Sequence, residues 1–276
     1  MAGHIPTVHV SGSTIPEAWE KAVLAVSENG VEVRTEYDKS KDPPSLDATL
    51  MAEVRRPLGE PRIHKNFPGG PAELEIYRQE VLYGIHDHWI NPAEGKWTYT
   101  YHQRLFQYSG GVQQMEWMVN KLSEVPYSRR AQAITWIPEQ DPDTDDPPCL
   151  QRVWARLLPD GRDGYVLNLN THWRSRDLYK AWFMNVYALT DLQDWLANRL
   201  AEEMGKPVKC GRYVDISDSL HIYGSYRDKD FEEELEKMRS SSYEDRAWET
   251  SVLEPMFSEV RANLEKDPDY YAKGSA

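Results

Sequence analysis

The feature that most constrains the fold of this chain is a pair of predicted β-strands joined by a short turn. Residues 150–158 and 164–172 are rich in β-forming and alternating side chains, and between them lies Pro159-Asp160-Gly161-Arg162-Asp163. Alternation with a period of two is typical of a strand with one buried face, and Pro, Asp and Gly favour a tight turn. The sequence therefore predicts a β-hairpin in the middle of the chain.

Helical periodicity on both sides of this hairpin sets the fold class. An apolar-rich stretch over 181–204 predicts the longest helix, and the tail from residue 228 is helical in pattern and highly charged. We find no internal repeat and no linker long enough to divide the chain, so we expect a single α+β domain over residues 1–276 with a central mixed sheet flanked by helices. Further helices are predicted over 14–29, 71–85 and 110–123, and further strands over 48–56, 130–137, 208–216 and 219–224.

Composition excludes several classes of function. The 276 residues carry a formal charge of −13, which argues against a DNA-binding surface but not against a small anionic substrate. No apolar stretch reaches the length of a membrane span, and no signal peptide is evident. Only two cysteines are present, Cys149 and Cys210, which is no disulfide framework. We expect a cytoplasmic protein with no membrane contact.

Cys149 is the candidate nucleophile, because its surroundings in the sequence are unusual for a structural cysteine. It follows Pro147-Pro148, and Arg174-Ser175-Arg176-Asp177 lies downstream. Arginine binds phosphate in a forked geometry, and nearby cations lower the pKa of a thiol. We therefore expect the arginines both to bind a phosphate and to activate the sulfur. Cys210 has no such company, and we expect it to be structural.

Several short motifs occur together in a fixed order. They are Ser128-Arg129-Arg130, Pro148-Cys149, Arg174-Ser175-Arg176-Asp177, Asn185 and His221-Ile222-Tyr223. In this order and spacing the chain resembles the thymidylate synthase and pyrimidine nucleotide hydroxymethylase superfamily. The run Tyr99-Thr100-Tyr101-His102-Gln103-Arg104-Leu105 is similar to the compact archaeal-type synthases.

The resemblance implies a role for each motif. Cys149 would add to C6 of the pyrimidine ring, which makes C5 nucleophilic. Arg174 and Ser175 would bind the nucleotide phosphate, and Asp177 would serve catalysis by contacting the pterin of 5,10-methylenetetrahydrofolate, the cosubstrate. The other implied substrate-binding residues are Asn185 at the uracil edge, His221 and Tyr223 at the sugar hydroxyl, and Arg129 and Arg130, which would reach the phosphate of the other subunit in a homodimer.

Two further roles in the family need a residue from the N-terminal third. Glu80, on the predicted 71–85 helix, is our candidate for the catalytic glutamate, and Glu75 is the alternative. Arg34 is the candidate for the N-terminal phosphate-binding arginine, although the family's Arg-Thr-Gly reads Arg34-Thr35-Glu36 here. The resemblance implies no metal, and the two histidines of His86-Asp87-His88 point to different faces of a helix end.

Two departures from the family pattern leave the product open. Leu150 follows the nucleophile where the common synthases have histidine, and the chain ends in Lys273-Gly274-Ser275-Ala276 instead of an apolar residue. The leading hypothesis is conversion of dUMP to dTMP, because an amide at Asn185 can donate and accept at the uracil edge. The alternatives are a dUMP, dCMP or CMP 5-hydroxymethylase and, in another class, a non-catalytic nucleotide- or RNA-binding homologue.

Overall fold

The computed structural model describes residues 3–94 and 96–271, and its centre is one mixed sheet. The strand order is β1-β3-β8-β7-β6-β5, with β2 paired to the N-terminal end of β3. The pairs β1/β3 and β7/β8 are parallel, and the remaining neighbours are antiparallel. The α+β class and the mixed central sheet expected from the sequence are confirmed. The strands are β1 (Thr7–Gly12), β2 (Val31–Val33), β3 (Ser45–Val54), β5 (Gln132–Ile134), β6 (Leu150–Pro159), β7 (Tyr165–Asp177) and β8 (Val208–Ile222), and a separate two-stranded sheet joins β4 (Ile63–His64) to β9 (Ala247–Trp248).

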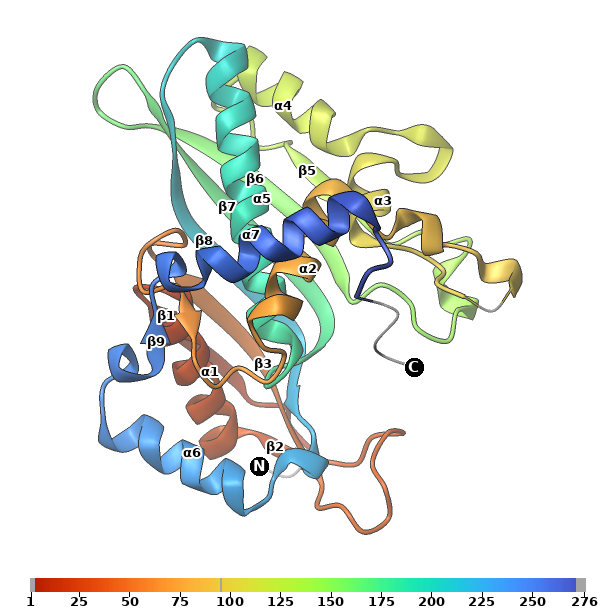
Figure 1. Ribbon diagram of the computed structural model, residues 1–276, viewed down its shortest axis with the longest axis vertical. Coiled ribbons are helices and arrows are strands. Elements are labelled where there is room, and N and C mark those ends of the chain that lie inside the picture. The colour runs from red at the N-terminus through yellow and green to blue at the C-terminus, as the bar shows by residue number, and fades with distance from the viewer. Residues whose placement is uncertain (1–2, 95, 272–276) are drawn as a thin grey trace.

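The helices cover one face of this sheet. Along β7, Leu167, Leu169, Thr171 and Trp173 are buried, whereas the residues between them are only half-buried. In Figure 1, α5 lies in front of β6 and β7, with α7 crossing it and α1 below. The α-helices are α1 (Ile15–Asn29), α2 (Pro71–Tyr83), α3 (Tyr101–Phe106), α4 (Gln114–Glu124), α5 (Ala181–Met204), α6 (Lys229–Ser240) and α7 (Thr250–Lys266).

The predicted hairpin and the long helix are confirmed. β6 and β7 pair from Leu150 opposite Trp173 to Pro159 opposite Tyr165, and Gly161 in the turn has a φ of 79° that favours glycine. Helix α5 spans the predicted residues 181–204, and its apolar side chains fill the core against β7 and β8. Helix formers dominate this segment, and Gly205 at the C-cap adopts the left-handed conformation that ends a helix.

Three sequence expectations need correction. The helix predicted over 110–123 begins only at Gln114, and Val112, which lies within the predicted range, is 53% exposed. Gly110 and Gly111 both have positive φ, which breaks the helix before this point. The strand predicted over 130–137 shortens to three residues, and the two strands predicted over 208–216 and 219–224 are one continuous strand, β8.

Candidate active site

Cys149 lies at the end of the loop that enters β6, and Arg174 of β7 fixes this loop. The guanidinium donates from Nε to the Pro148 carbonyl (3.1 Å) and from Nη2 to the Pro147 carbonyl (2.6 Å). The Arg174 backbone N–H also donates to the Cys149 carbonyl (2.9 Å). Three contacts to consecutive residues hold the half-buried thiol in one position. Positioning of this kind is what covalent catalysis requires of a nucleophile.

The electrostatics at Cys149 differ from the sequence expectation. Burial raises the pKa of the thiol above its ordinary value, and the Arg174 charge only partly opposes this. Asp146 raises the pKa further, whereas Arg176 lowers it. The prediction that nearby arginines would give an activated thiolate is therefore wrong for this state of the protein, because desolvation of the sulfur outweighs both cations.

A cavity of about 750 Å³ opens at the loop that leads to Cys149. Glu80 of α2 and Tyr99 and Tyr101 are among its lining residues, and so are three aspartates of the loop before Cys149. Tyr101 joins this cavity to the nucleophile loop, because its hydroxyl accepts from the Leu150 N–H (3.3 Å). Glu80 pairs with His86 Nδ1 (3.0 Å), so its carboxylate is held at the wall of the cavity. The remaining lining residues are Pro92, Lys96, Trp97, Thr98, Thr100, Asp143, Thr144, Asp145 and Asp146.

A smaller cavity of about 240 Å³ brings Ser175, His221 and Tyr223 together, as the sequence motifs suggested. His221 is only 8% exposed, and its Nε2 has no hydrogen-bond partner among the described residues. Burial lowers the pKa of this imidazole, although Asp177 and Asp47 oppose the shift, so the ring is neutral near pH 7. Burial also raises the pKa of the Tyr223 hydroxyl to about 12, with Asp177 adding to the shift. His221 and Tyr223 thus present neutral hydrogen-bonding groups to a cavity whose lining also includes the carboxyl groups of Glu36 and Asp47.

Asn185 and Asp177 are both engaged in hydrogen bonds. Asn185 in the first turns of α5 is 7% exposed, and its Nδ2 donates to the Tyr77 hydroxyl (2.7 Å). Asp177 accepts from the backbone N–H groups of Tyr179 (2.8 Å) and Lys180 (3.0 Å), which stabilises the turn that leads into α5. Its other oxygen accepts from the Tyr226 hydroxyl (2.8 Å).

The remaining predicted arginines lie apart from Cys149. Arg129 and Arg130 are exposed and line a different cavity of about 430 Å³, with Lys121 and Tyr127. Arg34 is exposed and donates to the Asp42 carbonyl (2.6 Å). Its neighbours Thr35 to Tyr37, but not Arg34, line the smaller cavity around His221. Within one chain, therefore, Arg174 is the predicted phosphate-binding arginine nearest to the nucleophile loop.

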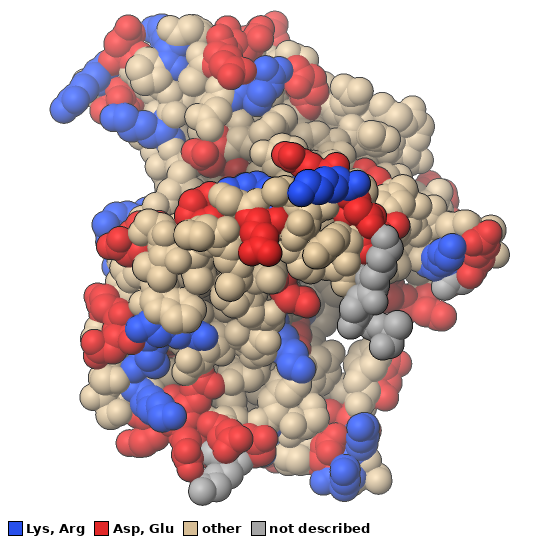
Figure 2. Space-filling model, viewed as in Figure 1, with Lys and Arg blue, Asp and Glu red and all other residues tan. Residues whose placement is uncertain are grey.

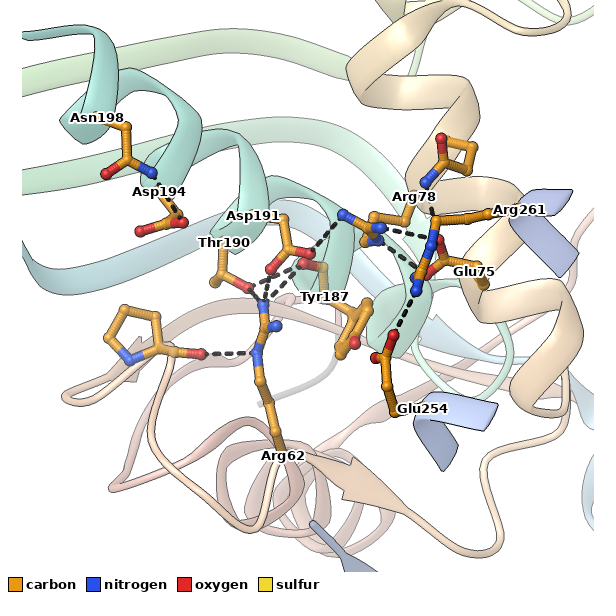
Figure 3. A network of polar contacts seen from close by, with 12 residues as sticks. Arg62, Glu75, Arg78, Tyr187, Thr190, Asp191, Asp194, Asn198, Glu254 and Arg261 are labelled. Carbon is orange, nitrogen blue, oxygen red and sulfur yellow. Dashed lines mark hydrogen bonds and ion pairs between the residues drawn. The ribbon is translucent and has the colours of Figure 1, made fainter. Parts of the chain in front are cut away.

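Figure 3 shows why Glu75 does not join the site. Its carboxylate accepts a forked pair of hydrogen bonds from Arg78 (2.9 and 2.7 Å), and Arg261 of α7 reaches it at 3.2 Å. The same network continues to Asp191 and Arg62. Glu75 has no exposed surface, so it links α2 to α7 and α5 and leaves Glu80 as the glutamate at the cavity.

Four residues near the site were given no individual role in the sequence analysis. Tyr77 contacts Asn185, Tyr101 contacts the nucleophile loop, and Asp47 lines the smaller cavity. Arg176 is 3% exposed, stacks 4.1 Å above the Trp173 ring and pairs with the buried Asp215. The sequence contained a signal for two of them, because Tyr101 lies in the Tyr-x-Tyr run and Arg176 in the Arg-Ser-x-Asp motif.

Other functions receive no support from the described residues. Among them, no group of three or more His, Cys, Asp or Glu side chains is placed to hold a metal ion. No helix in residues 3–94 and 96–271 is long and apolar enough to cross a membrane. On the face shown in Figure 2, Lys and Arg are dispersed among Asp and Glu and form no continuous basic patch.

The mixed sheet with its covering helices is the fold of a thymidylate synthase-type protein. The family model described as thymidylate synthase matches residues 75–252, and the chain belongs to the thymidylate synthase family. Among curated relatives, a putative thymidylate synthase of Methanosarcina acetivorans is 31% identical over 216 residues, which cover 78% of this chain and 88% of that protein. A putative thymidylate synthase of Methanothermobacter thermautotrophicus is 29% identical over 226 residues, covering 76% and 90%.

A solved structure shares the fold. Thermostable thymidylate synthase A from Bacillus subtilis superimposes with a TM-score of 0.59 at 17% identity and covers 83% of this chain and 85% of its own. The resemblance stated from the sequence motifs is therefore confirmed at the level of family and fold. The two curated relatives are from methanogen genera, which agrees with the archaeal-type layout inferred from Tyr99 to Leu105.

Proposed function

We propose that this protein transfers a one-carbon unit to C5 of dUMP and forms dTMP, with 5,10-methylenetetrahydrofolate as cosubstrate. The observation that carries the proposal is the placement of the loop that ends at Cys149. Arg174 holds this loop, Asp143 to Asp146 of the loop line the large cavity, and Ser175, next to Arg174 in β7, lines the smaller one. A nucleotide can then contact the thiol while its sugar and phosphate reach the smaller cavity. We further propose that the chain is a single domain, because the residues assigned to the site come from elements spread along most of its length.

The proposed chemistry begins at Cys149. Its sulfur bonds to C6 of the ring as the thiol proton leaves, and the electrons of the C5–C6 double bond make C5 nucleophilic. C5 then bonds to the one-carbon unit. When a base removes the C5 proton, the bond between this carbon and the folate nitrogen breaks, which leaves an exocyclic methylene on C5 and free tetrahydrofolate. In the last step a hydride from the folate reduces the exocyclic methylene while the sulfur–C6 bond breaks. We assign Glu80 to the proton transfers on the cavity side, because its carboxylate lines the wall of the cavity.

The other residues bind the substrates. We assign the phosphate to Arg174 and Ser175, the sugar hydroxyl to His221 and Tyr223, and the base edge to Asn185. His221 fits this role because its buried Nε2 is without a partner, which a sugar hydroxyl would supply. We assign Asp177 to the pterin, which its carboxylate would contact from the turn between β7 and α5. The cosubstrate fits the large cavity, where Trp97, Tyr99 and Tyr101 offer aromatic surface to a flat ring.

We further propose a homodimer in which Arg129 and Arg130 complete the partner's phosphate site. Both side chains are exposed and lie away from Cys149 of their own chain. The Arg129 carbonyl accepts from the Trp154 indole of β6 (3.1 Å), which ties this segment to the half-buried face of the sheet that the helices do not cover. A second copy on that face would bring the arginines toward the partner's site. A cytoplasmic location stays a prediction.

The alternative product is a 5-hydroxymethyl nucleotide, in which water captures the exocyclic methylene. Leu150 favours this alternative, because it is fully buried directly after the nucleophile, where the common synthases have a polar histidine. The residues that close the chain, Lys273 to Ala276, lie outside the described part. dUMP, dCMP and CMP are all to be tested as acceptors.

The decisive experiment incubates the protein with each pyrimidine monophosphate and methylenetetrahydrofolate. The product is identified by mass, and dihydrofolate is followed by absorbance. Methyl product with equimolar dihydrofolate supports the synthase, whereas hydroxymethyl product without dihydrofolate supports the hydroxymethylase. A 5-fluoropyrimidine nucleotide should also leave a covalent adduct on Cys149. No product and no adduct would favour the non-catalytic nucleotide- or RNA-binding homologue.

A further inference from the structure

His86 lies just after α2, beside the glutamate that we assign to proton transfer. Its Nδ1 is 3.0 Å from Glu80 Oε2, and the residue is only 5% exposed. Within the described part of the chain, this imidazole is the one hydrogen-bond partner of the carboxylate. Of the two residues, Glu80 lines the large cavity. His86 would therefore act on a bound substrate through Glu80.

Two tryptophans hold the imidazole in its orientation. Trp89 stacks on the ring, with the centroids 3.7 Å and the planes 9° apart, and Trp97 meets it edge-on at 5.9 Å. Trp89 is itself anchored, because its indole N–H donates to Asp269 (2.6 Å). Trp97 lines the same cavity as Glu80. Turning the imidazole would therefore require a tryptophan to move.

The hydrogen bond has one direction while Glu80 is ionised. A carboxylate only accepts, so Nδ1 carries the hydrogen and donates it. The two carboxylate oxygens are equivalent, and rotating the group exchanges them without changing the contact. One oxygen is thus bound to His86 and the other is left for the cavity. If the second oxygen takes up a proton, the first still accepts from Nδ1.

We propose that His86 is the positioning residue of Glu80, which makes the carboxylate act as a base through a single fixed oxygen. This inference rests on the proposed function. The free oxygen takes the proton from C5, and the electrons of the C5–H bond form the exocyclic double bond. The folate nitrogen keeps the electrons of the broken carbon–nitrogen bond and takes up a proton from water. His86 keeps its hydrogen throughout.

Other groups at the cavity do not hold this carboxylate. Lys96 pairs with Glu94 at 2.9 Å. The Tyr101 hydroxyl accepts from the loop that carries the nucleophile, so its position follows that loop. The aspartates of the 143–146 loop have no hydrogen to donate when they are ionised. The imidazole is thus the group that fixes the base.

The test compares two substitutions of His86. His86→Phe keeps an aromatic ring against Trp89 and removes the donor, whereas His86→Asn returns an N–H close to the position of Nδ1. His88→Phe is the matched control, because the His88 side chain is 48% exposed and contacts Asp269 (2.9 Å) instead of Glu80. Asp269 keeps its contact with Trp89 in this control.

Two rates separate removal of the C5 proton from the steps before it. Release of tritium from dUMP labelled at C5 requires that proton to leave. Formation of the covalent adduct with 5-fluoro-dUMP and methylenetetrahydrofolate ends before this step, because fluorine does not leave as a cation. We expect His86→Phe to slow tritium release by roughly ten- to hundredfold, because the base is misplaced. The adduct rate and the dissociation constant of dUMP should stay near native.

The controls should behave in opposite ways. His86→Asn should regain most of the lost rate, and His88→Phe should release tritium as the native protein does. Circular dichroism checks folding, and if His86→Phe does not fold, His86→Leu replaces it with the same expected loss and the same refuting results.

The outcomes distinguish this inference from the proposed function. Native protein that turns over no pyrimidine monophosphate would refute the proposed function. Native turnover with an undiminished tritium release in folded His86→Phe would overturn only the role of His86. A variant that slows adduct formation as much as tritium release, or an equal loss in His86→Asn, would overturn it too, because the effect would then not come from a hydrogen bond to the base.

Discussion

Replacing Arg176 with methionine should destabilise the protein in a strongly pH-dependent way. Arg176 is 3% exposed and Asp215 is fully buried, and the two form an ion pair beneath the site. Methionine keeps much of the packing on Trp173 but leaves the carboxylate without its cation. Removing one partner of a buried ion pair typically costs about 3–5 kcal/mol.

The structure narrows this magnitude. A buried carboxylate without a cation can take up a proton. For an aspartate with the reference pKa in water, protonation costs a free energy of about 4 kcal/mol at pH 7 and about 1.5 kcal/mol at pH 5. Asp215 also accepts from the Trp182 indole (3.2 Å) and the Tyr213 hydroxyl (3.2 Å), which stabilise the charge in part. We therefore expect Arg176→Met to lower the free energy of unfolding by about 2–4 kcal/mol at pH 7.

The sign of the pH dependence follows from proton binding. In the variant the folded state holds a proton on the carboxyl group that the unfolded state has released at pH 7, so the variant loses stability as the pH rises from 5 to 7. In the native protein Arg176 provides the counter-charge that the variant lacks. The difference in unfolding free energy between the two proteins should therefore grow by about 1–2 kcal/mol from pH 5 to pH 7.

Urea denaturation at pH 5, 6 and 7 measures this difference. Arg176→Met/Asp215→Asn is the matched control, because it removes both charges and should abolish the added pH dependence. Arg199→Met tests an exposed ion pair with Glu202 and should change stability little. A cost below about 1 kcal/mol at pH 7, or a cost that does not fall at pH 5, would show that the buried ion pair does not contribute as argued.

Four further results are expected from the site. Cys149→Ser should abolish turnover and keep nucleotide binding, measured by calorimetry, because an alcohol is a far weaker nucleophile than a thiolate. The pKa of Cys149 from its alkylation rate should lie above that of an ordinary thiol, and Arg174→Met should raise it further, since a cation that lowers it is lost; an unchanged or lower midpoint would contradict this. Asn185→Asp should shift kcat/KM toward cytosine by about ten- to hundredfold, and a native preference for cytosine would show that Asn185 has been misassigned. Mixed Cys149→Ser and Arg130→Ala subunits should regain activity if arginines cross the dimer interface, whereas a fully active monomer in sedimentation would exclude the shared site.

The long periodic elements could be predicted from the sequence, and the short ones could not. Helix α5 and the β6–β7 hairpin have a strong pattern over many residues, so local sequence sufficed. Helix α3, with six residues, was not recognised because it has too few turns for a period to emerge. β5 has only three residues, Gln132–Ile134, because the chain joins the sheet after Arg129 and Arg130 and departs from it after Ile134. A strand of this length is too short for an alternating pattern to define its ends.

The part of the site that consists of short contiguous motifs could be predicted from the sequence. The motifs Pro148-Cys149 and Arg174-Ser175-Arg176-Asp177 together predicted a shared site, and in the structure Arg174 donates a hydrogen bond to the Pro148 carbonyl. The contact of Tyr77 with Asn185 could not be read in this way, because it depends on how two helices far apart in sequence pack. The pKa of Cys149 was misjudged for a related reason, since the degree of burial is a property of the fold.

The error in β8 has a structural cause that also explains the site. Between Ala48 and Leu50 of β3, the paired residue in β8 passes from Leu220 to Ser217, which is one residue more than a regular ladder allows. Such a bulge reverses the faces of a strand, and it breaks the period of two on which a sequence prediction depends. Ser217 therefore faces the buried Arg176, whereas His221 beyond the bulge lines the smaller cavity. A regular ladder would have turned His221 into the core, so the irregularity within β8 is what directs its imidazole toward the smaller cavity.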